Sequence, residues 1–598
     1  MKISKVKIFN WRSIVSEDIS FQDLMIFIGQ NNHGKSNVLS SILFFFGELN
    51  HQYLDFNGDA EELWVEIEFS EISDDEKITF KKYVSSSNKI KVRKTALKNG
   101  SFSYNGYIEE ANEDWLKESK ISDFKKREVA ETLPLANFLP SKGAITIEQF
   151  KIAQIEYITA NIDDISFNYV LEEANFLGLK NVAKGSFGDL FFIPSVKNAS
   201  DELNPRGNSL FSQLYSRVIN KISEHNPQFI EAKEKIIQLT KILNKTNDAG
   251  DINEDRPEDL TSLENLLDEE LISWNTKIDI QISTPNVDDI FRVGANVSID
   301  DGIKTDISRK GHGLQRALIF ALIKAWSKVL KQDREAMLSD ADLKSSTRKA
   351  SKSTYFIFEE PELFLHPQAQ RELFSSLVNL SKEESQVILC THSSSFLDLE
   401  HHKSICIVQK ENNEKGTKIL QFVNDVFNDL EEKKKFNLSY WINPERSELF
   451  FAKKVILVEG QTDKTVIPML AKSFDLFRYD FTVIDCGSKD NIPLYISLLN
   501  KFKIKYCAVY DKDHQIGKDA NGIASANKSS KNIEDVVDEL IGKTHILIND
   551  IEEELGMTEK ATGGKAYKAI SFINDENFKI SESFKKTIIE IYSDYVHD

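Results

Sequence analysis

The chain has 598 residues, of which 41% are hydrophobic and 28% are charged, and its formal net charge is −19. This length exceeds what one hydrophobic core can organise, so we expect about three or four domains in an ordinary globular protein. The acidic balance argues against a general binder of polyanions, although local basic faces and bound metal ions can override it. The apolar runs are too short to span a membrane and the N-terminus lacks a signal-peptide pattern, so we expect no membrane partner.

The four cysteines have neither disulfide nor zinc-site spacing; they are Cys390, Cys406, Cys486 and Cys507. Such cysteines are typical reduced core residues, and we expect a cytoplasmic protein. Lysine-rich stretches lie at residues 81–82, 89–98 and 433–435. We interpret each stretch as a solvated face rather than a groove for DNA.

Residues 29–36, Gly-Gln-Asn-Asn-His-Gly-Lys-Ser, match the pattern G-x-x-x-x-G-K-[ST] in full. They follow an apolar run at residues 24–28 and precede a helical pattern from residue 37, the strand-loop-helix context that a phosphate loop requires. The backbone N–H groups are expected to cradle the β-phosphate of a nucleotide, with Lys35 on the β/γ-phosphates and Ser36 on Mg²⁺. The predicted ATP-binding residues of this loop are Asn31, Gly34, Lys35, Ser36 and Asn37.

The first half of the chain mixes strand and helix patterns. Strands are predicted at residues 2–9, 63–69 and 190–193, whereas residues 70–186 give no clear pattern. From residue 208 to residue 275 apolar side chains recur at helical spacing, which predicts a small helical insertion. Its helices are too short to form the long rod of a chromosome-cohesion protein.

In the second half, strands are expected at 277–282 and 295–299, followed by an apolar helix that ends at residue 330 and a polar loop at 332–353.

Two further buried strands in the second half end in polar side chains. The strand at 355–358 ends in Glu359 and Glu360, which suggest an outer Mg²⁺ ligand and a base for hydrolytic water. The strand at 387–390 is followed by His392. A lone histidine is usually structural, but one at the carboxyl end of a strand is well placed to sense a phosphate.

These elements resemble, in the same order, the ATP-binding-cassette ATPase heads of the recombination-mediator and cohesion type. Residues 29–36 match Walker A, residues 356–360 resemble Walker B with Glu359 in place of the usual aspartate, and His392 matches the switch histidine. Residues 308–316 lie where the signature motif belongs, so either Ser308 or the turn containing Gly311 and Gly313 is expected to contact the nucleotide. In such heads two protomers enclose ATP, which implies at least a homodimer.

A second set of acids follows the strands predicted at residues 455–458 and 506–510. Glu459 and Asp463 follow the first of these strands, and Asp511 and Asp513 follow the second. In a parallel α/β domain the carboxyl ends of the strands meet at one edge, so the four carboxylates converge. They repel one another unless cations neutralise them, and hard oxygen ligands select Mg²⁺ or Mn²⁺.

This arrangement resembles the Toprim domain of topoisomerases, primases and related nucleases. An ATPase head followed by Toprim is the architecture of the OLD (overcoming lysogenization defect) family of nucleases. By that similarity Glu553 is a candidate metal ligand and Lys565 a candidate for stabilising phosphoryl charge, although residues 552–554 also fit a solvated helix face. The resemblance predicts an α/β protein with an ABC- and RecF-like head at 1–207 and 276–435, a dimerisation insertion at 208–275 and Toprim at 436–598.

The function that follows is an ATP-regulated DNA endonuclease with two metal ions about 3.5–4 Å apart. OLD-type proteins act in bacterial anti-phage defence, including Gabija and some retrons, so the resemblance implies a neighbouring partner such as a helicase or a reverse transcriptase with its RNA–DNA product. The alternatives are a DNA clamp or repair factor without cleavage, against which the carboxylates argue because bare acids repel phosphate, and a topoisomerase or primase.

Overall fold

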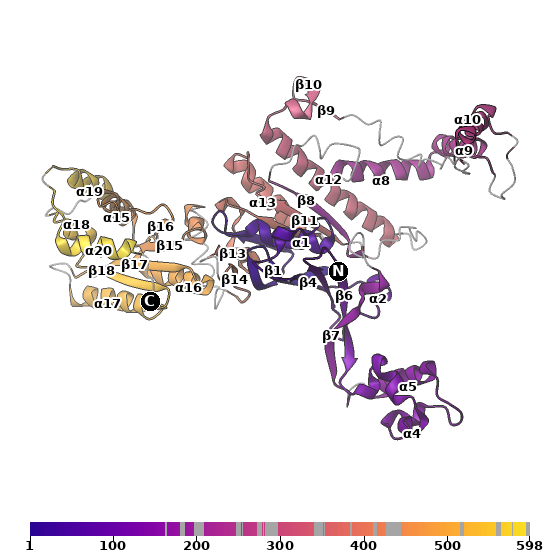
Figure 1. Cartoon of the computed structure of the whole chain (residues 1–598). Coiled ribbons are helices and arrows are strands. Elements are labelled where there is room, and N and C mark those ends of the chain that lie inside the picture. The colour runs from indigo at the N-terminus through magenta and orange to yellow at the C-terminus, as the bar shows by residue number, and fades with distance from the viewer. Residues whose placement is uncertain are drawn as a thin grey trace. The chain divides into compact units, whose positions relative to one another are not determined.

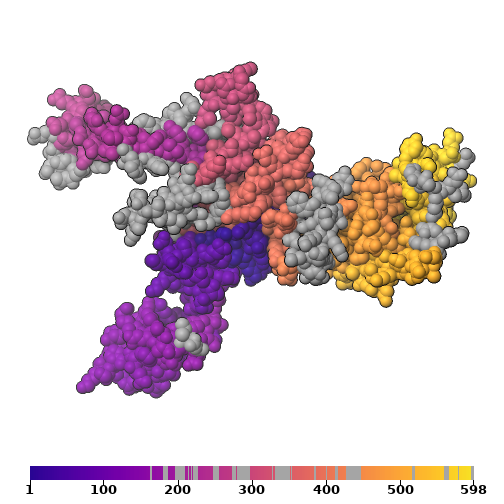
Figure 2. Space-filling model, turned by 180° about the vertical axis from the view of Figure 1, so that it is seen from behind, coloured from indigo at the N-terminus to yellow at the C-terminus, as the bar shows by residue number. Residues whose placement is uncertain are grey.

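The structure is a computed structural model of the whole chain. It describes residues 1–161, 164–179, 186–195, 209–246, 253, 255–271, 278, 280, 297–339, 351, 353–382, 385–410, 415–425, 444–514, 519–557, 564–576 and 578–593. Two compact units emerge: one comprises Met1–Ser195, Ser346–Leu363 and Gln370–Asp598, and the other comprises Val196–Ser345 and Phe364–Ala369. Figure 1 labels the elements, and in Figure 2 the residues from about 450 onward form one continuous orange-to-yellow body.

A six-stranded, largely parallel sheet holds the phosphate loop. Its order is β14 (Thr417–Gln421), β13 (Ile405–Lys410), β3 (Leu24–Ile28), β12 (Ser385–Cys390), β11 (Thr354–Glu359) and β8 (Asp189–Ile193). All pairings are parallel except that of β13 with β14. β3 and β12 are buried along their whole length, as expected for strands covered on both faces. The carboxyl ends of β3, β11 and β12 therefore share one edge.

A second sheet is antiparallel throughout. Its order is β2 (Ile14–Ser20), β1 (Lys2–Trp11), β4 (Glu62–Ser70), β5 (Ile90–Leu97), β6 (Phe102–Ala111) and β7 (Phe167–Asn175). The predicted strands at 2–9 and 63–69 are confirmed as β1 and β4. Most of the stretch without a clear sequence pattern consists of β5, β6, β7 and a group of short helices with a core of its own, which includes α5 (Ile147–Ala160).

Helix α1 (Lys35–Phe46), which begins at the phosphate loop, is anchored at its other end by the antiparallel sheet. The Lys94 ammonium donates to the carbonyl oxygen of Phe44 at 2.6 Å, and the Tyr104 hydroxyl donates to that of Phe45 at 2.6 Å. The last carbonyls of a helix lack intrahelical partners, so these bonds satisfy them. Burial lowers the pKa of Lys94 to about 7. The helix that supports the loop is therefore fixed at both ends.

The unit that contains residues 196–345 is mainly helical. It includes α8 (Leu210–His225), α9 (Pro227–Leu243) and α10 (Glu258–Glu270), in agreement with the predicted helices, and the short strands β9 (Ser298–Asp300) and β10 (Lys304–Asp306). Helix α12 (His312–Ser339) continues beyond residue 330, so the expected loop from residue 332 is wrong for its first part. Residues 332–339 are mostly good helix formers, with Gln, Arg, Glu, Ala, Met and Leu among them, which explains the continuation. The strand expected at 277–282 lies outside the described residues except for residues 278 and 280, and the lysine-rich stretch 433–435 lies wholly outside them.

The C-terminal domain has a four-stranded sheet in which every pairing is parallel. Its order is β16 (Phe481–Asp485), β15 (Lys454–Val458), β17 (Lys505–Asp511) and β18 (Gly542–Leu547). The connecting helices are α15 (Gln461–Ser473), α16 (Ile492–Phe502) and α17 (Ala520–Glu534), and α19 (Lys565–Ile573) and α20 (Glu582–Tyr592) follow the last strand. This confirms the predicted small α/β domain. Its four strands present their carboxyl ends at one edge.

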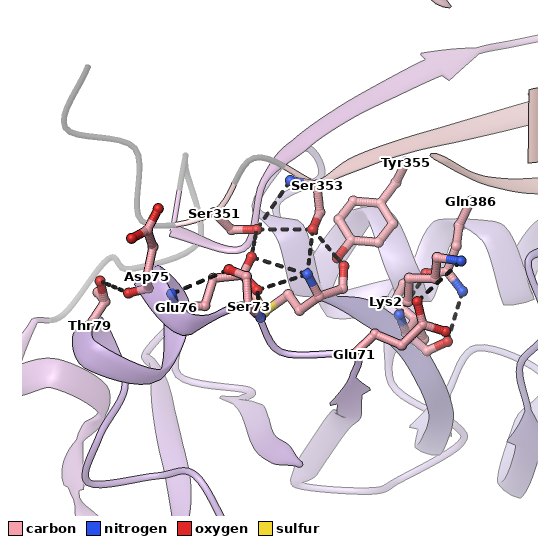
Figure 3. Close-up of polar contacts among 12 residues, drawn as sticks. Lys2, Glu71, Ser73, Asp75, Glu76, Thr79, Ser351, Ser353, Tyr355 and Gln386 are labelled. Carbon is pink, nitrogen blue, oxygen red and sulfur yellow. Dashed lines mark hydrogen bonds and ion pairs between the residues drawn. The ribbon is translucent and has the colours of Figure 1, made fainter. Parts of the chain in front are cut away.

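A buried carboxylate ties the start of β1 to the entry of β11 (Figure 3). The Glu76 side chain accepts bonds from the α-amino group of Met1 at 2.9 and 3.1 Å, and the Ser351 hydroxyl donates to it. The Ser353 hydroxyl donates to the Met1 carbonyl oxygen at 2.5 Å. Burial raises the pKa of Glu76, but these bonds outweigh it and hold the pKa below its ordinary value. The network therefore joins the two sheets through an ion pair that is closed to solvent.

Replacing Glu76 with glutamine is expected to lower the free energy of unfolding by about 3–5 kcal/mol, because the buried ammonium loses its counter-ion. Because the pKa of Glu76 is lowered, its contribution is present at neutral pH and is lost as the pH falls below about 4. The variant should therefore lose part of this acid dependence, as thermal unfolding at pH 3–8 would show. Asp75→Asn is the control, since Asp75 is exposed on the same helix; equal effects of the two changes would refute the assignment.

Candidate active sites

The phosphate loop occupies the turn between β3 and α1. Gly29 and Gly34 both have left-handed backbones, with φ of 147° and 102°. A Cβ atom at Gly34 would lie 2.5 Å from Thr417 Oγ1, so a side chain is excluded there by space as well as by conformation. Thr417 in turn donates to the carbonyl oxygen of His33 at 2.9 Å. The tight loop, which depends on its glycines, therefore leads directly into the N-terminus of α1, where backbone N–H groups can bind an anion.

Lys35 lies buried within this loop, with 6% of its surface exposed. Its ammonium donates to the carbonyl oxygens of Gly29 at 3.1 Å and Gln30 at 3.0 Å. Burial lowers the pKa of Lys35, and the nearby Glu360 and Glu362 oppose that effect. A nucleotide phosphate is a stronger acceptor than a carbonyl, so the ammonium is placed to exchange one for the other.

The first acid of the Walker B segment meets the loop directly. The Ser36 hydroxyl donates to Glu359 Oε1 at 2.6 Å. A hydroxyl oxygen and a carboxylate oxygen at this separation can act as protein ligands of an Mg²⁺ ion that also binds phosphate oxygens. When bound, the cation would supply charge to the β- and γ-phosphates. The structure therefore brings together Lys35, Ser36 and Glu359, as the sequence predicts for one nucleotide site.

The second acid, Glu360, lies beside the histidine that follows β12. His392 Nε2 is 3.5 Å from Glu360 Oε1, and Glu360 has a left-handed backbone with φ of 45°. Burial, and then the Lys35 charge, lower the pKa of His392 to about 4. The imidazole is therefore neutral at pH 7 and lies beside Glu360 without forming an ion pair with it. The left-handed backbone of Glu360 is a form of backbone strain, and such strain is concentrated at functional sites.

Glu362 is a third acid of this site, and the sequence reasoning did not assign it a role. Its Oε1 accepts the backbone N–H of His392 at 2.6 Å, while Oε2 is buried without a hydrogen-bond partner. Burial raises the pKa of Glu362, and the His392 bond opposes that shift. The only sequence signal was the third glutamate of Glu-Glu-Pro-Glu. The side chain fixes the turn on which His392 stands.

Two further residues beside the loop, Arg12 and Ser13, escaped the sequence reasoning, and both contact the predicted Asn37. Asn37 donates through Nδ2 to the Ser13 hydroxyl at 2.8 Å, and its Oδ1 accepts from Arg12 at 3.4 Å. Arg12 is held in place by Asp55, with Nε donating at 2.7 Å. The turn between β1 and β2 therefore places a guanidinium next to the first turn of α1.

The predicted signature segment lies in the other unit. Ser308 donates to Asp306 Oδ1 through its backbone N–H at 2.8 Å and through its hydroxyl at 2.6 Å. The turn at Gly311 and Gly313 opens α12, where the His312 ring stacks on Phe364 with ring centroids 5.0 Å apart. Contact of this segment with a nucleotide remains a prediction.

Removal of the Glu362 side chain tests its effect on His392. Glu362→Ala leaves the His392 N–H without its acceptor and should lower kcat for ATP hydrolysis by about 10- to 100-fold, because a displaced catalytic turn loses alignment. Glu362→Gln keeps an oxygen acceptor and should retain most of the rate. Phosphate-release kinetics with both variants measure the difference, and equal losses would show that the charge, not the bond, matters.

The second cluster of acids lies at the carboxyl edge of the C-terminal sheet. Glu459 follows β15, and its Oε1 accepts the backbone N–H of Asp511, at the end of β17, at 2.7 Å. Asp463 stands in the first turn of α15 and accepts the Gly460 N–H at 3.2 Å. Asp513 follows with a left-handed backbone, φ of 59°. The structure therefore brings the four predicted acids to one edge of the sheet.

The electrostatics of this cluster show that its negative charge is not compensated by the protein alone. Burial, and then Glu459 and Asp463, raise the pKa of Asp511 to about 9. Burial, and then Glu459, raise the pKa of Asp463 to about 7, and burial raises the pKa of Glu459. Asp511 Oδ1 is buried and has no hydrogen-bond partner. Such a group is costly unless a cation or a proton satisfies it.

The donor set fits a divalent cation in its chemistry. Carboxylate oxygens are the ligands of Mg²⁺ and Mn²⁺, and the unpartnered Asp511 Oδ1 is an open ligand position. Within the described ranges, however, no three His, Cys, Asp or Glu side chains already surround one point closely enough to hold an ion. Side-chain rotation of Glu459, Asp463 or Asp513 toward Asp511 would be needed for coordination.

The late acidic motif differs from the sequence expectation in detail. Glu553 is exposed, and its Oε2 accepts from Asn549 at 2.6 Å. Glu552 is only 6% exposed, and its charge contributes to the raised pKa of Asp463. Lys565 Nζ lies 3.5 Å from Glu552 Oε1 and is itself half exposed. Glu552 rather than Glu553 therefore faces the acidic cluster, because a turn of helix directs adjacent residues to different sides.

Replacing Asp511 with alanine should stabilise the metal-free protein while it removes a candidate ligand. The raised pKa means that the folded protein retains a proton that the unfolded chain releases near pH 4, so stability falls as the pH rises from about 4 to 9. Asp511→Ala should lack this fall and gain about 1–3 kcal/mol at pH 8. Thermal unfolding in EDTA measures it, with the exposed Glu553→Ala as control. Loss of stability in Asp511→Ala would contradict the charge repulsion.

The two sites define a protein that joins a phosphate-loop ATPase to a small parallel α/β domain with a carboxylate edge. A family model described as AAA ATPase domain matches residues 1–397, and the chain belongs to that family. The model described as overcoming lysogenization defect protein-like, TOPRIM domain, matches residues 450–513, so the predicted OLD-type architecture is confirmed. Nucleotide and divalent-metal use follow in general from these two domains.

The chain is homologous to three named nucleases. It is 25% identical to the Old nuclease of Escherichia phage P2 over 427 residues, which cover 69% of this chain and 67% of that protein. It is 30% identical to the OLD nuclease of Thermus scotoductus over 165 residues, or 26% of this chain and 30% of that protein. Endonuclease GajA of Bacillus cereus is 30% identical over 187 residues, or 27% of this chain and 26% of that protein.

Among solved structures, an SMC head bound to the C-winged helix domain of ScpA is similar, at 13% identity and a TM-score of 0.35. The matched region covers 73% of this chain and 100% of that chain. We assign the fold from the order of the strands in the sheets and from the matched domains, and not from this similarity. Among the helices that the structure describes, none combines the length and the apolarity that a membrane crossing requires.

Proposed function

We propose that the chain is an ATP-regulated, divalent-metal-dependent endonuclease that hydrolyses phosphodiester bonds of DNA. The observation that supports this most is the uncompensated acidic edge, where Asp511 Oδ1 is buried without a partner beside Glu459 and Asp463. An acidic pocket repels DNA unless cations are bound. The homologous proteins are named nucleases, which is the activity expected from such a site.

In this proposal Glu459, Asp463, Asp511 and Asp513 hold two Mg²⁺ or Mn²⁺ ions. Bound divalent cations supply Lewis-acid charge and lower the pKa of a coordinated water. The protein holds the carboxylate oxygens in place: Glu459 Oε1 accepts the backbone N–H of Asp511 at 2.7 Å and so fixes the position of Asp511. Glu552 and Lys565 lie at the border of the same pocket, where the lysine is placed to meet an approaching phosphate.

ATP acts at the other site in this proposal. Lys35 and Ser36 bind the phosphates and the cation with Glu359, while Glu360 accepts a proton from the attacking water and His392 orients it. The hydrolytic and nucleolytic chemistries lie on separate domains, so the nucleotide acts as a control of cleavage. Two heads that enclose ATP, with the helices between residues 208 and 275 as further contact, form a homodimer.

The biological role that we propose is anti-phage defence in the cytoplasm. GajA carries the name of an endonuclease and is 30% identical to this chain over 187 residues. The four cysteines are buried thiols, as in a reducing compartment. A partner encoded nearby, a helicase or a reverse transcriptase with its RNA–DNA product, would release the nuclease on infection.

Plasmid cleavage with purified protein tests the proposal. Wild-type protein should nick or cut supercoiled plasmid with Mg²⁺ or Mn²⁺, and Asp511→Ala should reduce cleavage by at least about 10³-fold because the two-metal site loses a shared ligand. Lys35→Ala should abolish ATP turnover and leave Mn²⁺ affinity unchanged, since the two sites use different side chains.

Two other results would point to the rival functions. Absence of cleavage by wild-type protein in every nucleotide state, with tight DNA binding, would establish a clamp. A covalent protein–DNA adduct trapped by denaturant would establish strand passage with religation. ATP turnover by Lys35→Ala at the wild-type rate would show that the phosphate loop is not the hydrolytic site.

A further inference from the structure

A lysine lies inside the acidic edge of the TOPRIM domain. Lys489 begins the short helix η12 (Lys489–Asn491), just after β16, and only 7% of its surface is exposed. Its ammonium donates to the main-chain oxygen of Asp511, lies 3.4 Å from Asp513 Oδ2 and is 5.3 Å from the centre of the Tyr510 ring. Because β15 lies between β16 and β17, this side chain spans the end of the central strand.

Both hydrogen-bond acceptors of Lys489 belong to one turn. Asp511 contributes its carbonyl oxygen and Asp513 its carboxylate, so the ammonium bridges the two ends of Asp-x-Asp. Asp513 has a left-handed backbone with φ of 59°. Residues other than glycine adopt this conformation uncommonly, although aspartate does so more readily than most, and an external restraint helps to hold the turn. The lysine bridge supplies one.

The peptide groups of Asp511 are held from both sides. Glu459 Oε1 accepts the Asp511 N–H at 2.7 Å, and Lys489 donates to the Asp511 carbonyl oxygen. With N–H and C=O both engaged, the backbone of Asp511 has little freedom, and its side chain projects from a fixed point. Its Oδ1 is the buried oxygen that has no protein partner. The restraint therefore acts on the two acids that the proposed metal site shares.

We propose that Lys489 is a positioning residue of the TOPRIM site, which clamps the Asp511–Asp513 turn so that both carboxylates face the same cation. The inference rests on the proposed metal-dependent cleavage. A lysine that only neutralised the pocket would have the opposite effect on metal binding. Its removal would leave more negative charge and strengthen cation binding, whereas loss of a clamp weakens cation binding by misplacing ligands.

The neighbouring Lys512 provides a matched control. It lies between the two acids, carries the same charge and is exposed. Lys489→Met should weaken Mn²⁺ binding by about 10-fold, as loss of an outer restraint on a ligand does, and slow plasmid cleavage by about 100-fold. Lys512→Met should change either quantity less than about threefold, since an exposed charge contributes little. Isothermal titration with Mn²⁺ in the absence of nucleotide gives the affinity, and a nicking assay gives the rate.

A double-mutant cycle tests whether Lys489 acts through Asp513. Asp513→Asn should lower cleavage and Mn²⁺ affinity, and Lys489→Met added to it should lower them by less than it does in the wild-type protein, because one of the two acids that the clamp holds is then already lost. Independent roles would instead multiply the two losses. ATP turnover by the head should equal that of wild type in all variants, which controls for folding. Where Lys489→Met fails that control, Lys489→Gln, which keeps a donor for the Asp511 carbonyl, replaces it in the cycle.

The outcomes separate the inference from the proposed function. Wild-type protein that neither binds Mn²⁺ at the acidic edge nor cuts DNA overturns the function. Wild-type protein that cuts, together with a Lys489 variant that cuts equally well or binds Mn²⁺ more tightly, overturns the clamp alone. Multiplicative losses in the cycle also overturn it.

Discussion

Repulsion between buried carboxylates is the constraint on which the C-terminal half of the molecule depends. Parallel strands bring their carboxyl ends to one edge, and there Glu459, Asp463 and Asp511 lie together and have raised pKa values. Natural proteins retain such unfavourable charge where it performs a function. The fold tolerates it because the rest of the domain is an apolar core, formed by β15 and β17 and by the helices packed on them.

The ATPase part follows the same geometric principle with the opposite charge. The N-terminus of α1, the Lys35 ammonium and the Ser36 hydroxyl create an environment for anions, and Glu359 and Glu360 flank it from β11. Each half therefore uses the ends of parallel strands as a platform, one for a nucleotide's phosphates and one for cations. Nothing in the chemistry of either site requires the other.

Much of both sites was accessible from the sequence because their signals are local. The phosphate loop, Glu359 and Glu360, His392 and the acids at 459, 463, 511 and 513 each follow an apolar strand of four to six residues, which a sequence displays directly. The contributions of Glu362, Lys489 and Arg12 were not accessible. Each contacts a residue more than twenty positions away in the chain, and single charged residues after a turn occur everywhere on protein surfaces.

The antiparallel sheet shows a second limit. β5, β6 and β7 carry too much polar side chain on their solvent face to give a continuous apolar signal, and short helices interrupt the pattern between β6 and β7. The sequence could not distinguish Glu552 from Glu553 for another reason: both are glutamates, and only the rotation of a one-turn helix decides which of them is buried. Glu553 as a metal ligand stays a prediction.

The position of β3 has a consequence for synthesis of the chain. This strand lies between β12 and β13, which begin at Ser385 and Ile405. At about 5–20 residues per second, a ribosome needs roughly 20 to 75 seconds after β3 is made to produce both neighbours. Until then the five apolar residues of β3 have no neighbouring strands to pair with. The phosphate loop that follows them is likewise not held in place by a sheet. The nascent protein therefore has no ATP site, and β3 is a segment for chaperones to protect.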